Sequence, residues 1–128
     1  MSSRMRQPRP VKRVLLVESP SSERDRHTQT LLRNQYEITA ADTVEFARDL
    51  WRPQNFGLVL VSLNGFGSAA AGLCDEIKER DPRQVIAMIF HPDQELPPTE
   101  CPTLIFTTEP DEYFLARVET LTAVAHAA

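Results

Sequence analysis

The sequence predicts an α/β protein built on an open parallel sheet with helices on both faces. Three observations support this architecture. Short runs such as 58–61 (LVLV) are apolar at every position, which is typical of strands buried on both faces. These runs alternate with segments of helical apolar spacing that begin with capping residues. All segments are short, and 128 residues suffice for one domain with a single core.

The first strand is expected at 13–17. A helix follows from Ser22 to about Asn34, because Ser22 and Asp25 form an S-x-x-D start whose oxygens satisfy free backbone N–H groups. The weak inward face of this helix consists of His27, Thr28, Leu31 and Leu32. His27 is expected to be a surface or boundary side chain rather than a ligand, because no second His or Cys stands at chelating spacing.

The second strand is expected at 36–41. Asp42 and Glu45 form a D-x-x-E box that starts the second helix, and Pro53 ends it. The inward stripe of this helix is Val44, Ala47, Leu50 and Trp51. Trp51 is therefore expected in the core.

The third strand runs from 57 to Ser62 and ends in a glycine-flanked turn. Ser68 starts the third helix, which ends before Asp81. Its inward residues are Ala70, Leu73, Cys74 and Ile77. A strand that ends in this way leads directly to the sheet edge where α/β proteins place ligands and chemistry.

The fourth strand is expected at 84–90, after which the regular alternation fails. Four prolines lie between the fourth strand and residue 103, and they do not permit an ordinary helix there. The fifth strand is expected at 103–108. Thr108 and Asp111 form a T-x-x-D cap for the last helix. The apolar stripe of that helix is Phe114, Val118, Leu121 and Ala125.

The composition hides a charge asymmetry. Five of the fourteen basic residues lie in the first thirteen positions, which leaves nine against eighteen acids, a balance of −9, for the rest. Such a body does not resemble a nucleic-acid-binding surface. Residues 1–12 are expected to be a disordered basic leader, with a basic arm that touches nucleic acid or anionic lipid as the alternative. No apolar run is long enough for a membrane span, so a cytoplasmic protein is expected. Its two cysteines, Cys74 and Cys101, are expected to be free thiols. A disulfide between them is the alternative.

With these elements placed, the chain resembles the receiver (CheY-like) domains of two-component response regulators from about Arg13 to Val124. The matching blocks, in order and without gaps, are RVLLVE, YEITAAD with VEFA after it, LVLVSLN, GLCDEIKERDP and TEP. The resemblance implies a receiver-like domain at 13–125. It also implies a flavodoxin-like three-layer α/β/α fold with a five-stranded parallel sheet in the order 2-1-3-4-5, its fourth helix lost or shortened.

In that family an acidic pair after the first strand and an aspartate ending the third strand hold Mg²⁺, and the aspartate takes a phosphoryl group from a histidine kinase. Here Glu18 keeps the first acid, Ser19 replaces the second, and Ser62 stands at the phospho-accepting position. Ile89 replaces a hydroxyl residue on the fourth strand, and Glu109 replaces a lysine. The resemblance therefore implies a degenerate member, a pseudo-receiver.

Each replacement removes a chemical requirement. The Ser62 hydroxyl is neutral and has no base in this register, so it cannot attack a phosphohistidine as a carboxylate does. Glu18 and the carbonyl of Asn64 would give Mg²⁺ one charged ligand. Glu109 would repel phosphoryl oxygens. We expect no phosphorylation by the family chemistry, no metal, no cofactor and no enzymatic activity.

The expected partner face lies on the fifth strand and the last helix. Phe106 stands where many receivers have an aromatic switch residue, and Tyr113 and Arg117 follow on the last helix. The segment 91–102 is either recognised by a partner as an extended strand or polyproline piece, or is an irregular surface connection. A homodimer through the fifth strand and the last helix is one arrangement that this face allows.

These features favour a bacterial signalling domain that acts by phosphorylation-independent protein–protein interaction. Its partner would be a kinase, another regulator, an output domain or a second copy. The competing hypothesis is a small-ligand binder above the first and third strands, where the loop 19–22 could hold a phosphate as in flavin mononucleotide proteins. Two narrower alternatives remain, namely Ser62 as a target of a serine kinase and Glu18 as a cation ligand.

Overall fold

The structure is a computed structural model that describes residues 12–91, 93–98, 103–106 and 110–127. The strands are β1 (Arg13–Val17), β2 (Glu37–Ala41), β3 (Leu58–Ser62), β4 (Ile86–Phe90) and β5 (Thr103–Phe106). The helices are α1 (Ser22–Arg33), α2 (Val44–Leu50), α3 (Ser68–Arg80) and α4 (Asp111–Ala127). The expected leader lies, except for residue 12, outside the described residues.

The strands form one parallel sheet in the order β2-β1-β3-β4-β5. This is the order that was expected from the sequence. The strands β3 and β4 are buried at all five positions, and β1 is buried at every position after its first residue. Parallel strands that are covered on both faces need such continuous apolar sequences, which explains why the runs at 14–17 and 58–61 do not alternate.

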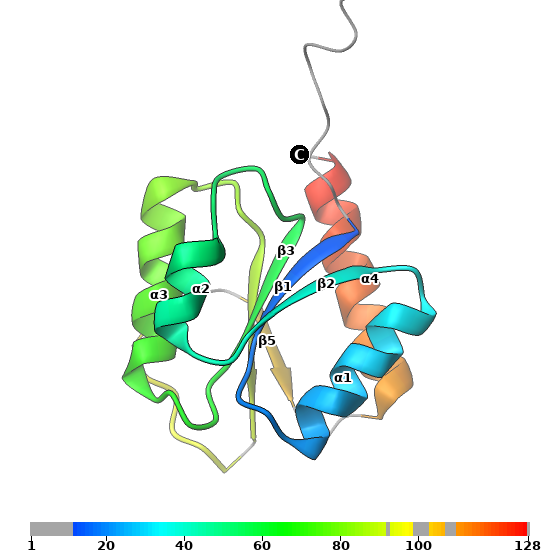
Figure 1. Cartoon of the computed structure of the whole chain (residues 1–128), viewed down its shortest axis with the longest axis horizontal. Coiled ribbons are helices and arrows are strands. Elements are labelled where there is room, and N and C mark those ends of the chain that lie inside the picture. Colours follow the sequence, from blue (N-terminus) through cyan, green and yellow to red (C-terminus); the bar gives the residue numbers. More distant parts are fainter. Residues whose placement is uncertain (1–11, 92, 99–102, 107–109, 128) are drawn as a thin grey trace, which may run out of the picture.

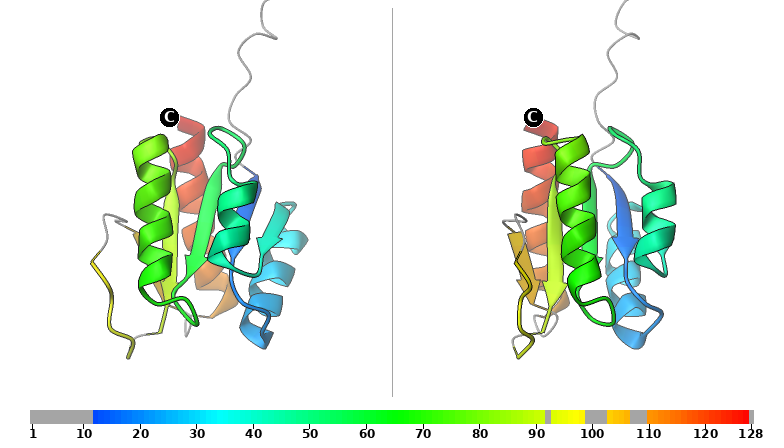
Figure 2. Two further views of the ribbon diagram at one scale, coloured as in Figure 1. Left: turned by 60° about the vertical axis from the view of Figure 1, so that its left-hand side comes forward. Right: turned by 90° about the vertical axis from the view of Figure 1, so that its left-hand side faces the viewer.

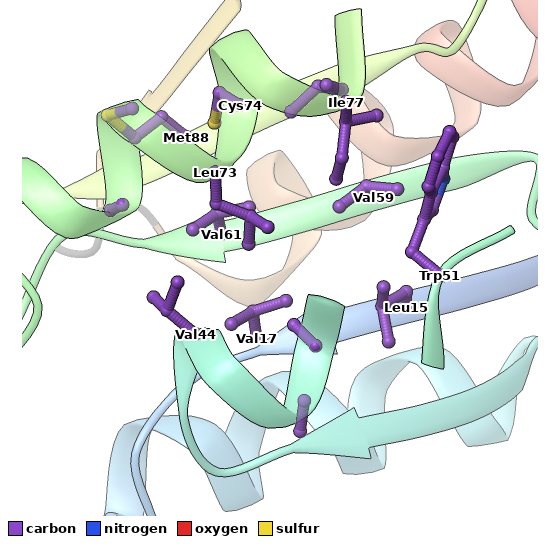
Figure 3. Close-up of a cluster of buried hydrophobic side chains, with 14 of the residues drawn as sticks. Leu15, Val17, Val44, Trp51, Val59, Val61, Leu73, Cys74, Ile77 and Met88 are labelled. Atoms are coloured by element: carbon purple, nitrogen blue, oxygen red, sulfur yellow. The ribbon is translucent and has the colours of Figure 1, made fainter. Parts of the chain in front are cut away.

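The helices form a layer on each face of the sheet, α2 and α3 on one side and α1 and α4 on the other (Figures 1 and 2). Each side has its own core. Leu15, Val17, Val59 and Val61 pack with Trp51, Leu73, Cys74 and Ile77 on the α2 and α3 side (Figure 3). On the other side Val14, Leu16, Leu58 and Leu60 pack with Leu31, Phe114 and Val118. The three-layer α/β architecture is therefore confirmed.

Two helix starts differ by one residue from the sequence-based expectation. Ser21 rather than Ser22 caps α1, and its hydroxyl accepts a hydrogen bond from the N–H of Arg24. Thr43 rather than Asp42 caps α2 in the same way. A cap residue needs an extended backbone and a side-chain oxygen three residues before a free N–H. Ser21 and Thr43 meet both conditions, and each lies one position away from the residue that was expected to cap the helix.

The inward face of α1 also differs in part from the expectation. Leu31 is fully buried, but Leu32 is 49% exposed. The apolar stripe of this helix is narrow, so one residue of rotation decides whether a leucine faces the core or the solvent.

The connection between β4 and β5 contains no helix in its described residues, 91 and 93–98. It begins with a turn in which the side chain of Gln94 accepts a hydrogen bond from the N–H of His91 (2.8 Å). This agrees with the expected loss or shortening of the fourth helix of the receiver pattern, because prolines remove backbone donors and restrict the residues before them. Among the described helices, none is both long and apolar enough to cross a membrane.

A buried polar cluster holds α2 and β4 together at the amino-terminal edge of the sheet. Gln84 is fully buried, and its side-chain oxygen accepts a hydrogen bond from the indole N–H of Trp51 (2.9 Å). Its side-chain nitrogen donates to the carbonyls of Phe56 and Val85 (both 3.2 Å). The guanidinium of Arg80 lies over the Trp51 ring, 5.1 Å from its centre. The expectation that Trp51 belongs to the core is therefore confirmed.

Replacing Gln84 should destabilise the domain by removing a partner that buried groups need. We expect Gln84→Ala to lower the free energy of unfolding by about 2 kcal/mol, because the Trp51 N–H is left unsatisfied in the core. Urea denaturation measures the effect. The control is Gln29→Ala on the exposed surface of α1, which should change the stability by less than about 0.5 kcal/mol. Equal effects in the two variants would contradict the structural role of Gln84.

Candidate functional site

The candidate site lies at the carboxyl ends of β1, β3 and β4, which share one edge of the parallel sheet. Val17 pairs with Val61 in the ladder, so Glu18 and Ser62 stand at neighbouring positions one residue further on. Ser62 in turn pairs with Ile89. The topology therefore brings together three of the site positions expected from the sequence.

Ser62 is held within its own strand-to-helix turn. It is 1% exposed, and its hydroxyl oxygen accepts a hydrogen bond from the N–H of Asn64 (3.3 Å). In the described part of the chain no histidine, lysine or carboxylate hydrogen-bonds to this hydroxyl. A neutral hydroxyl without a base is a poor nucleophile, so Ser62 has the properties of a structural residue.

The turn after β3 approaches the loop after β1 closely. Gly65 has a φ of +85°, and a Cβ atom added there would lie 3.3 Å from the hydroxyl oxygen of Ser19. Ser19 is thereby placed beside the β3 turn. Asn64, between Ser62 and this glycine, is exposed. Ile89 is fully buried in the core on the α1 and α4 side, so it presents no polar atom to the site.

The chemical centre of the edge is a buried pair that the sequence analysis did not anticipate. The Nδ1 atom of His27 lies 3.0 Å from Oε1 of Glu18, and the two side chains are 3% and 4% exposed. The His27 ring stacks on Phe114, with 4.5 Å between ring centres. The pair thus joins the end of β1 to both helices of one layer.

The expected place of His27 at the surface or its boundary is wrong. Its side chain is buried and holds the Glu18 carboxylate. A signal was present, because His27 shares the inward stripe of α1 with Leu31, one turn later. Chelating spacing indicates metal ligands and not hydrogen-bond partners, so it does not reveal a partner nine positions away along the chain.

The environment of the edge does not favour a divalent cation. Within the described ranges no group of three or more His, Cys, Asp or Glu side chains could hold a metal ion. The Glu18 carboxylate is buried and already hydrogen-bonded, and Arg24 donates to the Glu18 carbonyl (3.4 Å) and pairs with Asp42. Glu109 lies outside the described residues. The placed residues therefore offer Mg²⁺ no set of open carboxylates.

The structure places part of the expected partner face. Tyr113 is 59% exposed in the first turn of α4, and Arg117 is exposed one turn later on the same side of the helix. Phe106 ends β5, where it pairs with Phe90 in the ladder, and its side chain lies outside the described part. The face on α4 is thus available to solvent in the described structure.

Comparison with known proteins identifies the fold. No model of a protein family matches the sequence, and no curated protein is similar to it in sequence. A CheY-like receiver domain from Methanospirillum hungatei JF-1 has a TM-score of 0.74 at 17% identity, covering 91% of this chain and 98% of that one. The response regulator TrrA from Thermotoga maritima, in complex with Mg²⁺ and BeF, has a TM-score of 0.75 at 18% identity, covering 85% and 97%.

A third similar structure contains a second protein. It is the complex of the histidine kinase ThkA with TrrA, with a TM-score of 0.72 at 19% identity, covering 85% of this chain and 97% of the matched one. At these identities the similarity shows the fold alone. The chain therefore has the flavodoxin-like α/β fold of response regulator receiver domains.

The Glu18–His27 pair should contribute measurably to stability. We expect His27→Ala to lower the free energy of unfolding by about 3 kcal/mol, because it leaves a buried carboxylate without its partner and removes the contact with Phe114. Chemical denaturation checks this, with His91→Ala as the control. His91 is a third exposed and pairs with Glu23 at 3.4 Å, so its replacement should cost less than about 1 kcal/mol. An equal loss in both variants would contradict the role given to the pair.

The turn after β3 can be tested by replacing Gly65, which lies in it, and Gly72, which lies in α3, by alanine. Gly65→Ala should destabilise the domain by about 1 kcal/mol, because a positive φ strains a side chain and the new methyl group meets Ser19. Gly72 lies in α3 with open space around it, so Gly72→Ala should stabilise the domain by up to about 1 kcal/mol. Thermal unfolding of the two variants should therefore shift the midpoint in opposite directions. A midpoint that Gly65→Ala leaves unchanged or raises would show that the turn is not constrained as described.

Proposed function

We propose that this chain is a receiver-like signalling domain that acts by phosphorylation-independent protein–protein interaction in a bacterial two-component-type system. The observation that carries this proposal is the arrangement of side chains at the carboxyl ends of β1 and β3. The Glu18 carboxylate is bound to His27, and it lies beside a serine at the position of the phospho-accepting aspartate. The fold of receivers is kept, and the groups that accept and neutralise a phosphoryl group are absent from the placed positions.

The pseudo-receiver assignment follows from the chemistry of these side chains. A phosphoryl acceptor must be ionised or activated by a base, and the Ser62 hydroxyl bonds instead to a backbone N–H. A magnesium site needs several anionic oxygens, and the one carboxylate at this edge is buried with a histidine. On this basis we propose that the domain is no enzyme, binds no metal and needs no cofactor. A cytoplasmic location is a further part of the proposal, which these side chains do not bear on.

Its partner would be another protein, either a kinase, another regulator, an output domain or a second copy. The complex of ThkA with TrrA supports a protein partner, because TrrA has the same fold. Tyr113 and Arg117 supply an exposed aromatic ring and a guanidinium on one side of α4. Such residues are enriched at protein interfaces. Together with Phe106 they form the proposed partner face.

Phosphorylation can be tested directly with acetyl phosphate and Mg²⁺. We expect no mass increase in the wild-type protein, because Ser62 has no base and Glu18 no free carboxylate. The matched variant combines Ser19→Asp, Ser62→Asp and Glu109→Lys, which restores three of the four replaced residue types of the receiver pattern and leaves Ile89 unchanged, and it should gain the mass of one phosphoryl group. A stable phosphoryl group on the wild-type protein that maps to Glu18, Ser19 or Ser62 would overturn the proposal.

The partner face can be tested by measuring whether two copies of the domain associate through it. If two copies pair through β5 and α4, light scattering should show a dimer that Tyr113→Glu converts to a monomer, because the change places a charge in the contact. Glu79→Lys, an exposed change on α3, is the control and should leave the dimer intact. A wild-type monomer at all concentrations would exclude the homodimer and leave a different protein as the partner. A dimer that neither change affects would place the contact elsewhere.

A further inference from the structure

The outer edge of β2 has unpaired backbone groups in the described structure. β2 is the terminal strand of the sheet, and it pairs with β1 alone. The N–H of Glu37 donates to the Lys12 carbonyl (2.8 Å), and the carbonyl of Ala41 accepts from the Glu18 N–H (3.1 Å). In a parallel ladder every second residue of a strand bonds to the same neighbouring strand, and the residues between them point to the other side. The N–H and carbonyl groups of Ile38 and Ala40 therefore point away from β1, to the open edge.

This edge carries few of the features by which proteins block a terminal strand. Edge strands are usually interrupted by lysine, proline or a bulge, which prevents a further strand from pairing. β2 contains no lysine or proline and matches β1 residue for residue over its five positions. Its central residues, Thr39 and Ala40, are small. An additional strand would therefore find a regular and accessible ladder.

An exposed apolar side chain borders this edge on the α1 side of the sheet. Leu32 is 49% exposed. It lies about 140° around α1 from His27, which contacts Phe114 of α4. Leu32 is thus on the flank away from α4. Because α1 packs on β2, this flank faces the outer side of the edge strand.

A second exposed apolar side chain borders the edge on the other face of the sheet. Phe46 is 50% exposed and lies about 160° around α2 from Arg48. Arg48 pairs with Glu76 of α3 (2.8 Å), so Phe46 is on the flank away from α3. The helix α2 also packs on β2. Figure 2 (left) shows β2 at the border of the sheet, with α1 and α2 on either side. Two of the four exposed large apolar side chains in the described structure thus flank one strand.

The charges around the edge decide what kind of strand would fit. Asp25 lies on the Leu32 side of α1, and Asp49 lies one turn after Phe46 on α2. Both are exposed, and neither makes an ion pair within the described residues. Of the guanidiniums near these flanks, Arg13 pairs with Glu37 (3.6 Å), Arg24 pairs with Asp42, and Arg52 donates to the main-chain carbonyls of Asp49 and Trp51. Within the described residues the carboxylates of Asp25 and Asp49 are therefore left without an ion-pair partner along the edge.

We propose that the β2 edge is a docking site for an extended, basic segment of another protein, which adds to the sheet as a further strand. Main-chain hydrogen bonds to Ile38 and Ala40 would align the segment, as in other cases of strand addition. Its alternate side chains would cover Leu32 on one face and Phe46 on the other. Lysine or arginine in the segment would pair with the acidic flanks. A second copy of this chain fits less well, because two-fold pairing would bring the same acidic flanks together.

The proposal can be tested by nuclear magnetic resonance with a defined probe. The probe is a synthetic ten-residue peptide that alternates valine and lysine, and the control peptide alternates valine and glutamate. Addition of the basic peptide at about 1 mM should shift the backbone amide signals of Ile38 and Ala40, and the binding should weaken as salt is raised. The acidic peptide should cause no shift at these positions.

Matched variants separate strand addition from general charge attraction. Ala40→Pro removes only an outward N–H, so it should keep the fold and abolish the binding, whereas Ala40→Ser keeps the N–H and should bind normally. Phe46→Ser leaves the backbone unchanged and should weaken binding about tenfold. Melting of each variant confirms that it is folded.

Three outcomes would overturn the proposal. These are no shift at β2 with the basic peptide, equal binding of the acidic peptide, and unchanged binding in folded Ala40→Pro and Phe46→Ser. A concentration-dependent dimer that Ala40→Pro abolishes, without peptide binding, would assign the edge to a second copy instead. None of these results depends on the phosphorylation test or on Tyr113, so this edge and the partner face on α4 succeed or fail separately.

Discussion

The hydrogen bond between Glu18 and His27 is the interaction on which the rest of the candidate site depends. A carboxylate that is removed from water needs a partner, because burial of an unpaired charge costs several kcal/mol. His27 supplies that partner from α1, and its ring also packs on Phe114 of α4. One buried pair therefore fixes the end of β1 relative to both helices on that face, and it occupies the carboxylate that could otherwise serve a cation.

The parallel sheet and the chemistry at its edge are separable properties. A sheet in the order β2-β1-β3-β4-β5 brings the carboxyl ends of its central strands together whatever residues stand there. The backbone therefore offers a site by topology alone. Whether the site accepts a phosphoryl group depends on side chains such as Ser62 and Glu18, which is why the fold similarity to receivers does not by itself transfer their reaction.

The domain has two candidate surfaces of different physical character, one on α4 and one at the β2 edge. The α4 face offers exposed side chains, Tyr113 and Arg117, on a helix that the sheet holds in place. The β2 edge offers backbone groups, with Leu32 and Phe46 beside them. Side-chain surfaces and backbone edges recognise different kinds of partner, the first a complementary surface and the second an extended segment. A single rigid sheet can therefore present both without a change in its own structure.

The sequence by itself determined the architecture, because continuous apolar runs and capped helical stripes are local signals of a doubly covered parallel sheet. It also determined which positions meet at the edge, since Glu18 follows one central strand and Ser62 ends another. Only the tertiary structure decided what those residues contact. The partner of Glu18 stands nine positions away on another element, and the flanks of β2 come from two different helices. Such contacts depend on how the elements pack in three dimensions, and local periodicity does not record them.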